Sequence, residues 1–334
     1  MTSTSRIKAG LAVAALATLA LAGCSNGAAP ASTSTGDADA GGAPVTVSVA
    51  VLAPGSLQWL HAIAEDQGFY ADHGVEIEAI QVQSSSALVQ AVSSGSANAG
   101  IALGDNVIKA VDEGGKISIV GALNQRSSLR LFGASGISEI GQLEGAQVTA
   151  GAVEGGTADL MFYLLKEGGV DASSVVPVAM PNSSDRVVAM QNGQVKGALL
   201  IPPFDSVALS QGATMLATYD DYYLQTPAIV NDDWAAANPE GAAGFTQGLQ
   251  DAAKWIYDPA NEADAVRILA EYAGVDEKAA QDAYDFMVGE EIISPDLSVP
   301  EDSLTNIVKV SAEVNGGDVS DFDPSTYIDD QYLK

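Results

Sequence analysis

The sequence has very few of the side chains on which most catalytic and metal sites are built. Its 334 residues include one cysteine, Cys24, and two histidines, His61 and His73. A single cysteine allows no disulfide within the chain. A Ser-His-Asp triad, a Cys-His pair and a zinc site each need more of these residues than the sequence offers. We therefore expect no catalytic residue, no metal ligand and no cofactor, and a protein that is not an enzyme.

Positive charge is also scarce. Lysine and arginine total 14 against 43 aspartates and glutamates, which gives a formal net charge of −29. Such an acidic chain is repelled by phosphate backbones, so the composition excludes nucleic acid as a partner. Three arginines lie near predicted turns: Arg126, Arg130 and Arg186. Each would either clamp an anion through its two-pronged guanidinium or stay solvated at the surface.

Only the N-terminus carries a long apolar run. Arg6 and Lys8 precede residues 9–22, a run shorter than the ~20 residues that a membrane-spanning helix needs. We interpret residues 1–23 as a signal peptide. Its end, Leu-Ala-Gly before Cys24, resembles the lipobox of bacterial lipoproteins, in which the cysteine receives a diacylglycerol; an ordinary signal peptide is the alternative.

The segment after Cys24 is poor in apolar side chains. Residues 24–44 are mainly Ser, Ala, Gly, Thr and Pro, and this composition predicts a disordered tether. Together with the leader, it predicts an exported protein that a lipid on Cys24 anchors to the cell membrane at its extracellular face.

The rest of the chain alternates between strand and helix patterns. Residues 45–52 predict a buried strand, and Ser56 is the predicted N-cap of a helix that ends at Gly68. A second strand follows at residues 75–82. In such a βαβ unit the strand-to-helix turn lies at the carboxyl edge of the sheet, where ligands bind in α/β proteins.

The same pattern predicts two lobes, each a mostly parallel sheet flanked by helices. Residues 45–132 form the first part of lobe 1, and residues 133–222 form lobe 2. Residues 223–334 return to lobe 1 and have helical periodicity from Pro239 onward.

Four predicted turns share one design, in which a strand is followed by small polar residues and then by a helix start. They lie at residues 54–58, 84–86, 104–106 and 155–157. If the two lobes face each other, these turns line one cleft with backbone N–H groups and hydroxyls. Such a cleft is suited to holding a small molecule. The candidate ligand-binding residues are Ser56, Gln58, Trp59, Ser84, Ser85, Ser86, Gly104, Asp105, Asn124, Gly155, Gly156 and Thr157.

Two of these features have structural alternatives. The serines at 84–86 would cap a helix whether or not they bind a ligand. Trp59 would either stack on an apolar part of the ligand or pack on the first sheet.

Five short motifs follow one another along residues 45–274. They are Gly-Phe-Tyr at 68–70, Gly-Val-Glu-Ile at 74–77, Gly-Ser-Ala-Asn-Ala-Gly at 95–100, Gly-Thr-Ala-Asp at 156–159, and residues 190–197 followed by Pro-Phe at 203–204. Their order and spacing resemble those of the substrate-binding proteins of sulfonate/nitrate/taurine-type ABC transporters (SsuA/THI5-like, NMT1-like). The departures are Asn98 and Lys196, where the family prefers aspartate.

The resemblance implies a periplasmic-binding-protein-like fold of type II, with two hinge crossovers between the lobes. It implies a monomer that closes on a small-molecule ligand and delivers it to an ABC permease with ATPase subunits. A sulfonate, nitrate or similar organic anion is the ligand class that it suggests. The alternatives are a surface sensor or adhesion lipoprotein, and a THI5-like pyrimidine-binding protein. The enzymatic branch of the family uses a cysteine-rich motif that this sequence lacks.

Overall fold

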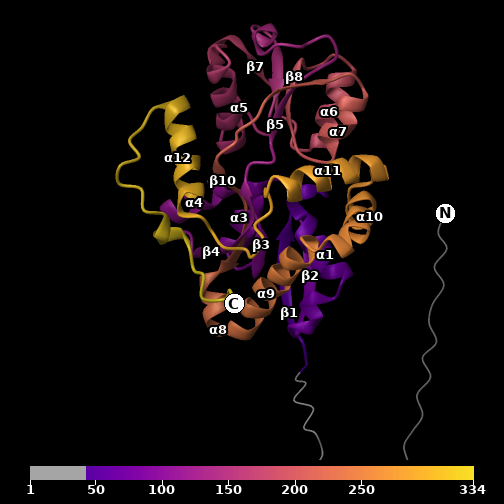
Figure 1. The fold of residues 1–334 in the computed structure, drawn as a ribbon. Coiled ribbons are helices and arrows are strands. Elements are labelled where there is room, and N and C mark those ends of the chain that lie inside the picture. Colours follow the sequence, from indigo (N-terminus) through magenta and orange to yellow (C-terminus); the bar gives the residue numbers. More distant parts are fainter. Residues whose placement is uncertain (1–42) are drawn as a thin grey trace, which may run out of the picture. The chain divides into compact units, whose positions relative to one another are not determined.

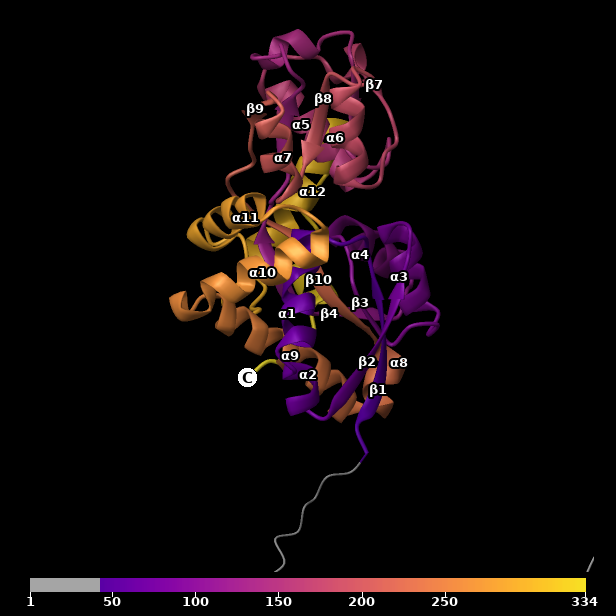
Figure 2. The same ribbon diagram turned by 90° about the vertical axis from the view of Figure 1, so that its right-hand side faces the viewer.

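Two β-sheets, each with its own helices, form two lobes in the computed structural model (Figure 1, Figure 2). The structure describes residues 43–334. The predicted signal peptide, Cys24 and most of the predicted tether lie outside this range. Within residues 43–334, none of the helices has the length and apolar character needed to cross a bilayer.

The first sheet contains five strands in the order β2-β1-β3-β10-β4. These are β1 (Val45–Val51), β2 (Val75–Gln81), β3 (Ala99–Ile101), β4 (Ile117–Arg126) and β10 (Tyr222–Asn231). β1 pairs in parallel with β2 and β3, whereas β10 pairs antiparallel with β3 and β4. Four strands therefore run one way, and the strand that returns from the second lobe runs the other way.

The second sheet repeats this arrangement in the order β7-β6-β8-β5-β9. Its strands are β5 (Arg130–Gly133), β6 (Gln147–Thr149), β7 (Val176–Pro177), β8 (Gly197–Leu200) and β9 (Thr214–Ala217). Here β5, the strand that enters from the first lobe, is the antiparallel one. The helices of this lobe are α5 (Gly156–Glu167), α6 (Ser183–Gln191) and α7 (Phe204–Ser210).

The chain passes between the lobes twice. Residues 127–129 connect β4 to β5, and residues 218–221 connect β9 to β10. Gln225 links β10 to the first passage, because its Oε1 accepts hydrogen bonds from the N (2.5 Å) and Oγ (3.1 Å) of Ser128. The predicted two-lobed α/β fold with mostly parallel sheets and two crossovers is confirmed.

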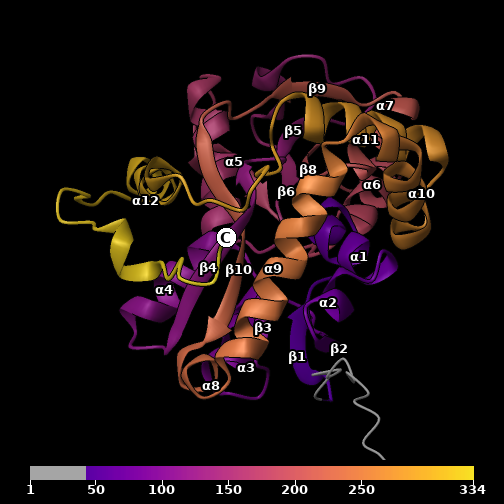
Figure 3. The ribbon, with the colours of Figure 1, turned by 60° about the horizontal axis from the view of Figure 1, so that its bottom comes forward.

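Helices cover both faces of the first sheet. On one face, α9 crosses the sheet (Figure 3) and packs with its neighbours around the buried Trp59, Ile63 and Phe245. On the other face, Leu88 and Val107 pack against the sheet from the two helices there. The first group is α1 (Trp59–Asp66), α2 (Phe69–Asp72), α9 (Pro239–Ile256), α10 (Glu262–Ala273) and α11 (Glu277–Gly289); the second is α3 (Ser85–Ser93) and α4 (Gly104–Asp112).

The turn after β1 differs from the prediction. A 3-10 turn over Ser56–Gln58 precedes α1, so the helix begins at Trp59 and Ser56 is not its N-cap. The backbone N–H of Ser56 instead donates to the carbonyl of Pro202 in the second lobe (3.3 Å). This bond holds the segment against the second lobe. The buried Ser56 hydroxyl has no hydrogen-bond partner among the described residues.

The C-terminal helix α12 (Glu301–Asn315) contacts both lobes, whereas the sequence predicts that the last helices pack on the first lobe and its hinge. Ser311 Oγ (2.7 Å) and Asn315 Nδ2 (3.0 Å) donate to the carboxylate of Asp159 on α5. Asn306 Nδ2 donates to the carbonyl of Tyr222 at the start of β10 (2.9 Å). The helix is therefore a third link between the lobes, besides the two passages of the chain.

Packing of α4 against β10 requires a glycine at position 104. A Cβ at Gly104 would collide with the carbonyl oxygen of Leu224 and lie 2.7 Å from Ile307 Cδ1. We expect Gly104→Ala to lower the free energy of unfolding by about 1–3 kcal/mol, as overpacked cores do. Urea unfolding followed by circular dichroism measures this loss. Gly289→Ala is the control, because a Cβ there meets nothing within 4 Å; unchanged stability in Gly104→Ala would contradict the packing argument.

Burial of His61 makes stability depend on pH. The side chain lies inside the first lobe beside Tyr70, and burial lowers its pKa to about 4. The unfolded chain binds this proton near pH 6.5, so stability is lost as the pH falls from 6.5 towards 4. We expect this residue to contribute up to about 1.4 kcal/mol per pH unit in that window.

Denaturant titrations at several pH values check this expectation. The slope of stability against pH between 6.5 and 4 should be smaller in His61→Gln than in the wild type. His73→Gln removes the other histidine, which lies nearer the surface beside Asp251, and should keep the drop caused by His61. Equal slopes in the wild type and His61→Gln would show that His61 does not cause the drop.

Candidate functional site

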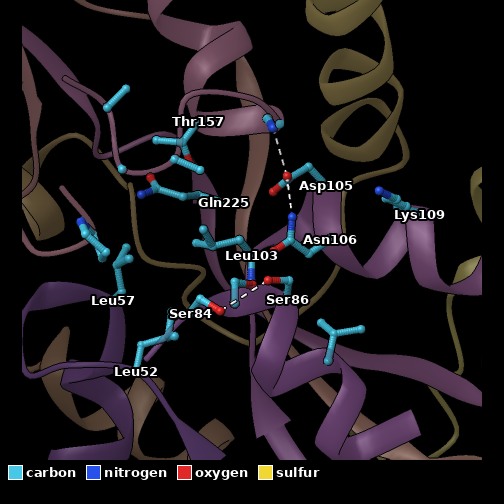
Figure 4. Close-up of a pocket in the computed structure, with 18 of the residues that line it drawn as sticks. Leu52, Leu57, Ser84, Ser86, Leu103, Asp105, Asn106, Lys109, Thr157 and Gln225 are labelled. Atoms are coloured by element: carbon cyan, nitrogen blue, oxygen red, sulfur yellow. Dashed lines mark hydrogen bonds between the residues drawn. The ribbon is translucent and has the colours of Figure 1, made fainter. Parts of the chain in front are cut away.

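A cavity of about 1440 Å³ lies between the two lobes. The first lobe contributes the end of β1 and the N-termini of α3 and α4; the second contributes the turn before α5, the start of α6 and the segment before α7. Figure 4 shows side chains from both lobes pointing into this space. Its apolar lining residues include Leu52, Leu57, Leu103, Ile201 and Phe204.

The three serines before α3 line the cavity and also serve the local structure. Ser84 Oγ caps α3 by accepting from the backbone N–H of Ala87 (3.2 Å), and it lies 3.1 Å from Ser86 Oγ. Ser85 Oγ accepts from the backbone N–H of Leu103 (2.9 Å). The capping alternative is therefore correct for Ser84. Ser86 is the most exposed of the three serines.

Asp105 reaches across the cavity to the start of α5. Its Oδ2 accepts a hydrogen bond from the backbone N–H of Gly156 (2.8 Å) and one from Asn106 Nδ2 (2.6 Å). Position 156 has to be a glycine, because a Cβ there would lie 2.5 Å from Asp105 Cβ. Burial raises the pKa of Asp105, and the bond from the Gly156 N–H partly opposes this rise. The predicted residues Asp105, Gly155 and Gly156 thus meet at one contact between the lobes, and Thr157 lines the cavity beside them.

Five of the predicted site residues do not line the cavity, and one of them is Ser56, which is buried in the turn after β1. Trp59 is fully buried in the first lobe, where its Nε1 donates to the carbonyl of Ala265 (3.1 Å) and its ring packs edge-on against Tyr284. The packing alternative is therefore correct for Trp59. Gly104 packs on β10, and the other two, Gln58 and Asn124, are buried at the ends of the first sheet.

Buried polar atoms without partners gather where the two lobes face each other. Within residues 43–334, eight buried side-chain nitrogens and oxygens have no hydrogen-bond partner. All belong to the turn after β1, to the strand ends beside the two passages, or to the end of β6. An unpaired buried polar group costs about 1–3 kcal/mol, so such a concentration at one place requires an explanation. The residues are Ser56, Gln58, Asn124, Arg126, Arg130, Thr149, Gln225 and Thr226.

Gln225 is a lining residue that the sequence analysis misses. It lies on β10, is 2% exposed, and its Nε2 is one of the eight unpaired atoms. In Figure 4 its side chain lies between Thr157 and Leu103, and its amide is directed away from Asp105. A glutamine followed by a threonine inside the otherwise apolar strand of residues 222–230 is the signal that could have pointed to it.

The three arginines are engaged within the protein. Arg186 is 5% exposed and donates to three main-chain carbonyls, those of Met180, Pro181 and Leu199. This differs from both alternatives, since the guanidinium is neither solvated nor open to an anion, and burial lowers its pKa to about 10. The Arg186 side chain forms part of the cavity wall.

The other two arginines lie beside the passages between the lobes. Arg130 pairs with the fully buried Asp205 and lies 3.9 Å from the ring centre of Phe286 on α11; burial lowers its pKa to about 10. Arg126 donates to the carbonyl of Asp220 (3.3 Å) and lies over the ring of Tyr222.

The described residues offer no grouping that suggests a metal or acid–base centre. Among residues 43–334, no three His, Cys, Asp or Glu side chains come together as metal ligands would. His61 is bonded to Tyr70 and His73 to Asp251, both away from the cavity. The cavity presents hydrogen-bonding groups, acidic side chains and apolar walls.

Solved structures with the same fold include binding proteins of transport systems. The alkanesulfonate-binding protein SsuA from Xanthomonas axonopodis pv. citri, bound to MOPS, has a TM-score of 0.65 at 15% identity, covering 82% of this chain and 93% of that one. The periplasmic aliphatic sulphonate-binding protein SsuA from Escherichia coli also has a TM-score of 0.65 at 15% identity, with coverage of 85% and 92%. The periplasmic nitrate-binding protein NrtA from Synechocystis PCC 6803 gives 0.61 at 16%, with coverage of 72% and 70%.

At these identities the likeness establishes the fold, which is the predicted periplasmic-binding-protein fold. No curated protein sequence matches the chain. The family model described as NMT1/THI5 like matches residues 61–263, which is more than half of the sequence and includes the polar turns before α3, α4 and α5. The chain belongs to the NMT1/THI5-like family.

Proposed function

We propose that this protein is the extracytoplasmic substrate-binding component of an ABC importer, which captures a small molecule between its lobes and delivers it to the permease. Family membership supports this proposal, as does the fold shared with sulfonate-binding and nitrate-binding proteins. The protein itself would carry out no chemical step on the ligand.

The observation that carries the proposal is the placement of the unpaired polar atoms. One of them, Gln225 Nε2, belongs to a residue that lines the cavity, and the others lie in the turn after β1, beside the two passages and at the end of β6. A bound molecule that offers an acceptor would pair this buried amide, which otherwise costs about 1–3 kcal/mol. Binding would then favour the closed arrangement, because only there do groups from both lobes reach the same molecule.

The two contacts across the cavity are consistent with a closed form that opens. Asp105 to Gly156 and Ser56 to Pro202 are single hydrogen bonds between the lobes, and neither buries a large apolar surface. A ligand in the cavity would add to these two hydrogen bonds, while α12 links the lobes at one side.

The N-terminal features complete the proposal. A signal peptide over residues 1–23, a lipid on Cys24 and a tether over residues 24–44 would hold the protein at the outer face of the membrane, next to the permease and its ATPase subunits. The protein would act as a monomer. Its lobe boundaries lie slightly apart from the predicted residues 132 and 222, because β5 (Arg130–Gly133) pairs in the second sheet and β10 begins in the first sheet at Tyr222. A lipid on Cys24 is checked by the mass of the mature N-terminal peptide.

Binding of a small molecule is tested on the purified full-length protein. A thermal-shift screen should include alkanesulfonates, nitrate, aromatic carboxylates, pyrimidines, riboflavin and small amines. A ligand at ~100 times its Kd should add about 2.7 kcal/mol to the free energy of unfolding. In small-angle scattering the same ligand should increase the closed fraction, seen as a smaller radius of gyration.

Matched threonine variants locate the binding. Thr157→Ala removes a hydroxyl that lines the cavity and should weaken binding by about tenfold, which corresponds to one net hydrogen bond. Thr305→Ala removes a hydroxyl on α12 that bonds only to the carbonyl of Glu301, and it should bind like the wild type. A folded protein without any ligand in a broad screen would favour the sensor or adhesion alternative.

A further inference from the structure

The hinge carries a hydrogen-bond donor whose partner is absent among the described residues. Gln225 Oε1 is held by the backbone N–H and the hydroxyl of Ser128, and this fixes which end of the amide is oxygen. Nε2 is left at the cavity with no acceptor, on a side chain that is 98% buried. A neutral amide N–H is suited to a carbonyl, a hydroxyl or a ring nitrogen, and it brings no positive charge to offset a negative ligand.

The place in the cavity best suited to an anion is already filled by the chain. The N-terminus of α5 carries free N–H groups and the positive end of the helix dipole, which favour a negative group. Asp105 supplies that group from the other lobe through its bond to Gly156. At the start of α5, an anionic ligand would have to displace this carboxylate or bind next to it.

The remaining charges of the cavity also disfavour an anion. Five acidic side chains line it, and two basic ones, Lys109 and Arg186. Arg186 is 5% exposed and donates three of its five N–H groups to main-chain carbonyls. Lys109 is exposed on α4, and in Figure 4 it lies on the side of Asp105 and Asn106 away from Leu57. Like charges in a partly closed site repel, and the net charge of the protein adds to this effect. The acidic residues are Asp105, Asp112, Glu113, Glu154 and Asp159.

We propose that the cavity takes a small molecule without net negative charge, which presents a hydrogen-bond acceptor to Gln225 Nε2 and an apolar part to Leu52, Leu57 and Phe204. Asp105 excludes anions by occupying the start of α5. This inference rests on the proposed function, since it names the class of ligand for the same cavity.

The test uses three anions as probes: sulfate, nitrate and benzenesulfonate. Isothermal titration calorimetry on the full-length wild-type protein should give no binding in the micromolar range for any of them. Asp105→Ala, which empties the start of α5, should bind sulfate or benzenesulfonate at least about tenfold more tightly than the wild type does, because a like charge is removed and a helix N-terminus is freed.

Two further variants separate charge from folding. Asp105→Asn keeps an acceptor for the Gly156 N–H while removing the charge, so it should gain anion affinity by a smaller factor than Asp105→Ala. Glu144→Ala removes an exposed acidic side chain of the second lobe that does not line the cavity, and it should stay close to the wild type. Circular dichroism and the unfolding midpoint of each variant without probe establish that it is folded.

Micromolar binding of any of the three anions by the wild type would overturn the inference, and so would folded Asp105 variants that gain no anion affinity. The proposed function fails in a different way. An anion that binds the wild type and closes the lobes would support the importer function while overturning the proposed ligand class. A gain of anion affinity in Asp105→Ala, with no ligand in a broad neutral and cationic screen, would support the charge assignment and contradict the function.

Discussion

The arrangement of the whole molecule depends on how the chain crosses between its lobes. Two short passages, residues 127–129 and 218–221, lie beside each other, and the amide of Gln225 ties the second to the first through Ser128. The returning strand β10 then enters the middle of the first sheet, where it pairs with both β3 and β4. The second passage therefore continues directly into a strand inside the first sheet, and this strand carries the cavity-lining residue Gln225.

Three kinds of contact hold the lobes together besides this hinge. The bonds of Asp105 and Ser56 cross the cavity itself. At one side, α12 bonds to α5 of the second lobe and to β10 of the first. At another, Arg130 of the second lobe lies over Phe286 of α11. Opening of the lobes has to break the two hydrogen bonds that cross the cavity. The helices α12 and α11 would either move with one lobe or exchange their partners.

Much of the fold follows from local patterns in the sequence. Apolar strands that end in small polar turns predict the βα units, and the return of a strand pattern near residue 228 predicts the second crossover. The polar turns at 84–86, 104–106 and 155–157 do contribute to the cavity, because strand ends of two facing lobes have to meet there. The antiparallel position of β10 between β3 and β4 needs pairing partners more than 90 residues away in sequence, which no local pattern specifies.

The surroundings of the site residues also depend on parts of the chain that are distant in sequence. Trp59 follows a polar turn and begins a helix, so the local sequence leaves open whether its ring faces the ligand or the core. Its ring is buried by α10 and α11, which come some 200 residues later in the sequence. Asp105 is visible as an acidic residue at a helix start, where it would favour its own helix. Its actual partner is the start of α5 in the other lobe, and this becomes apparent only when the lobes are placed together.

The unpaired polar atoms give the cavity a thermodynamic role as well as a lining. Each buried donor or acceptor without a partner costs about 1–3 kcal/mol, so the closed form without ligand is destabilised by the groups at its hinge. Shifting a two-state equilibrium from 1:99 to 99:1 takes about 5.5 kcal/mol. Of the eight atoms, Gln225 Nε2 is the one on a cavity-lining residue, so pairing it would supply part of such a shift and the other contacts of the ligand would supply the rest. Because Gln225 Oε1 is bonded to Ser128 in the first passage, a ligand that pairs Nε2 would contact the hinge directly.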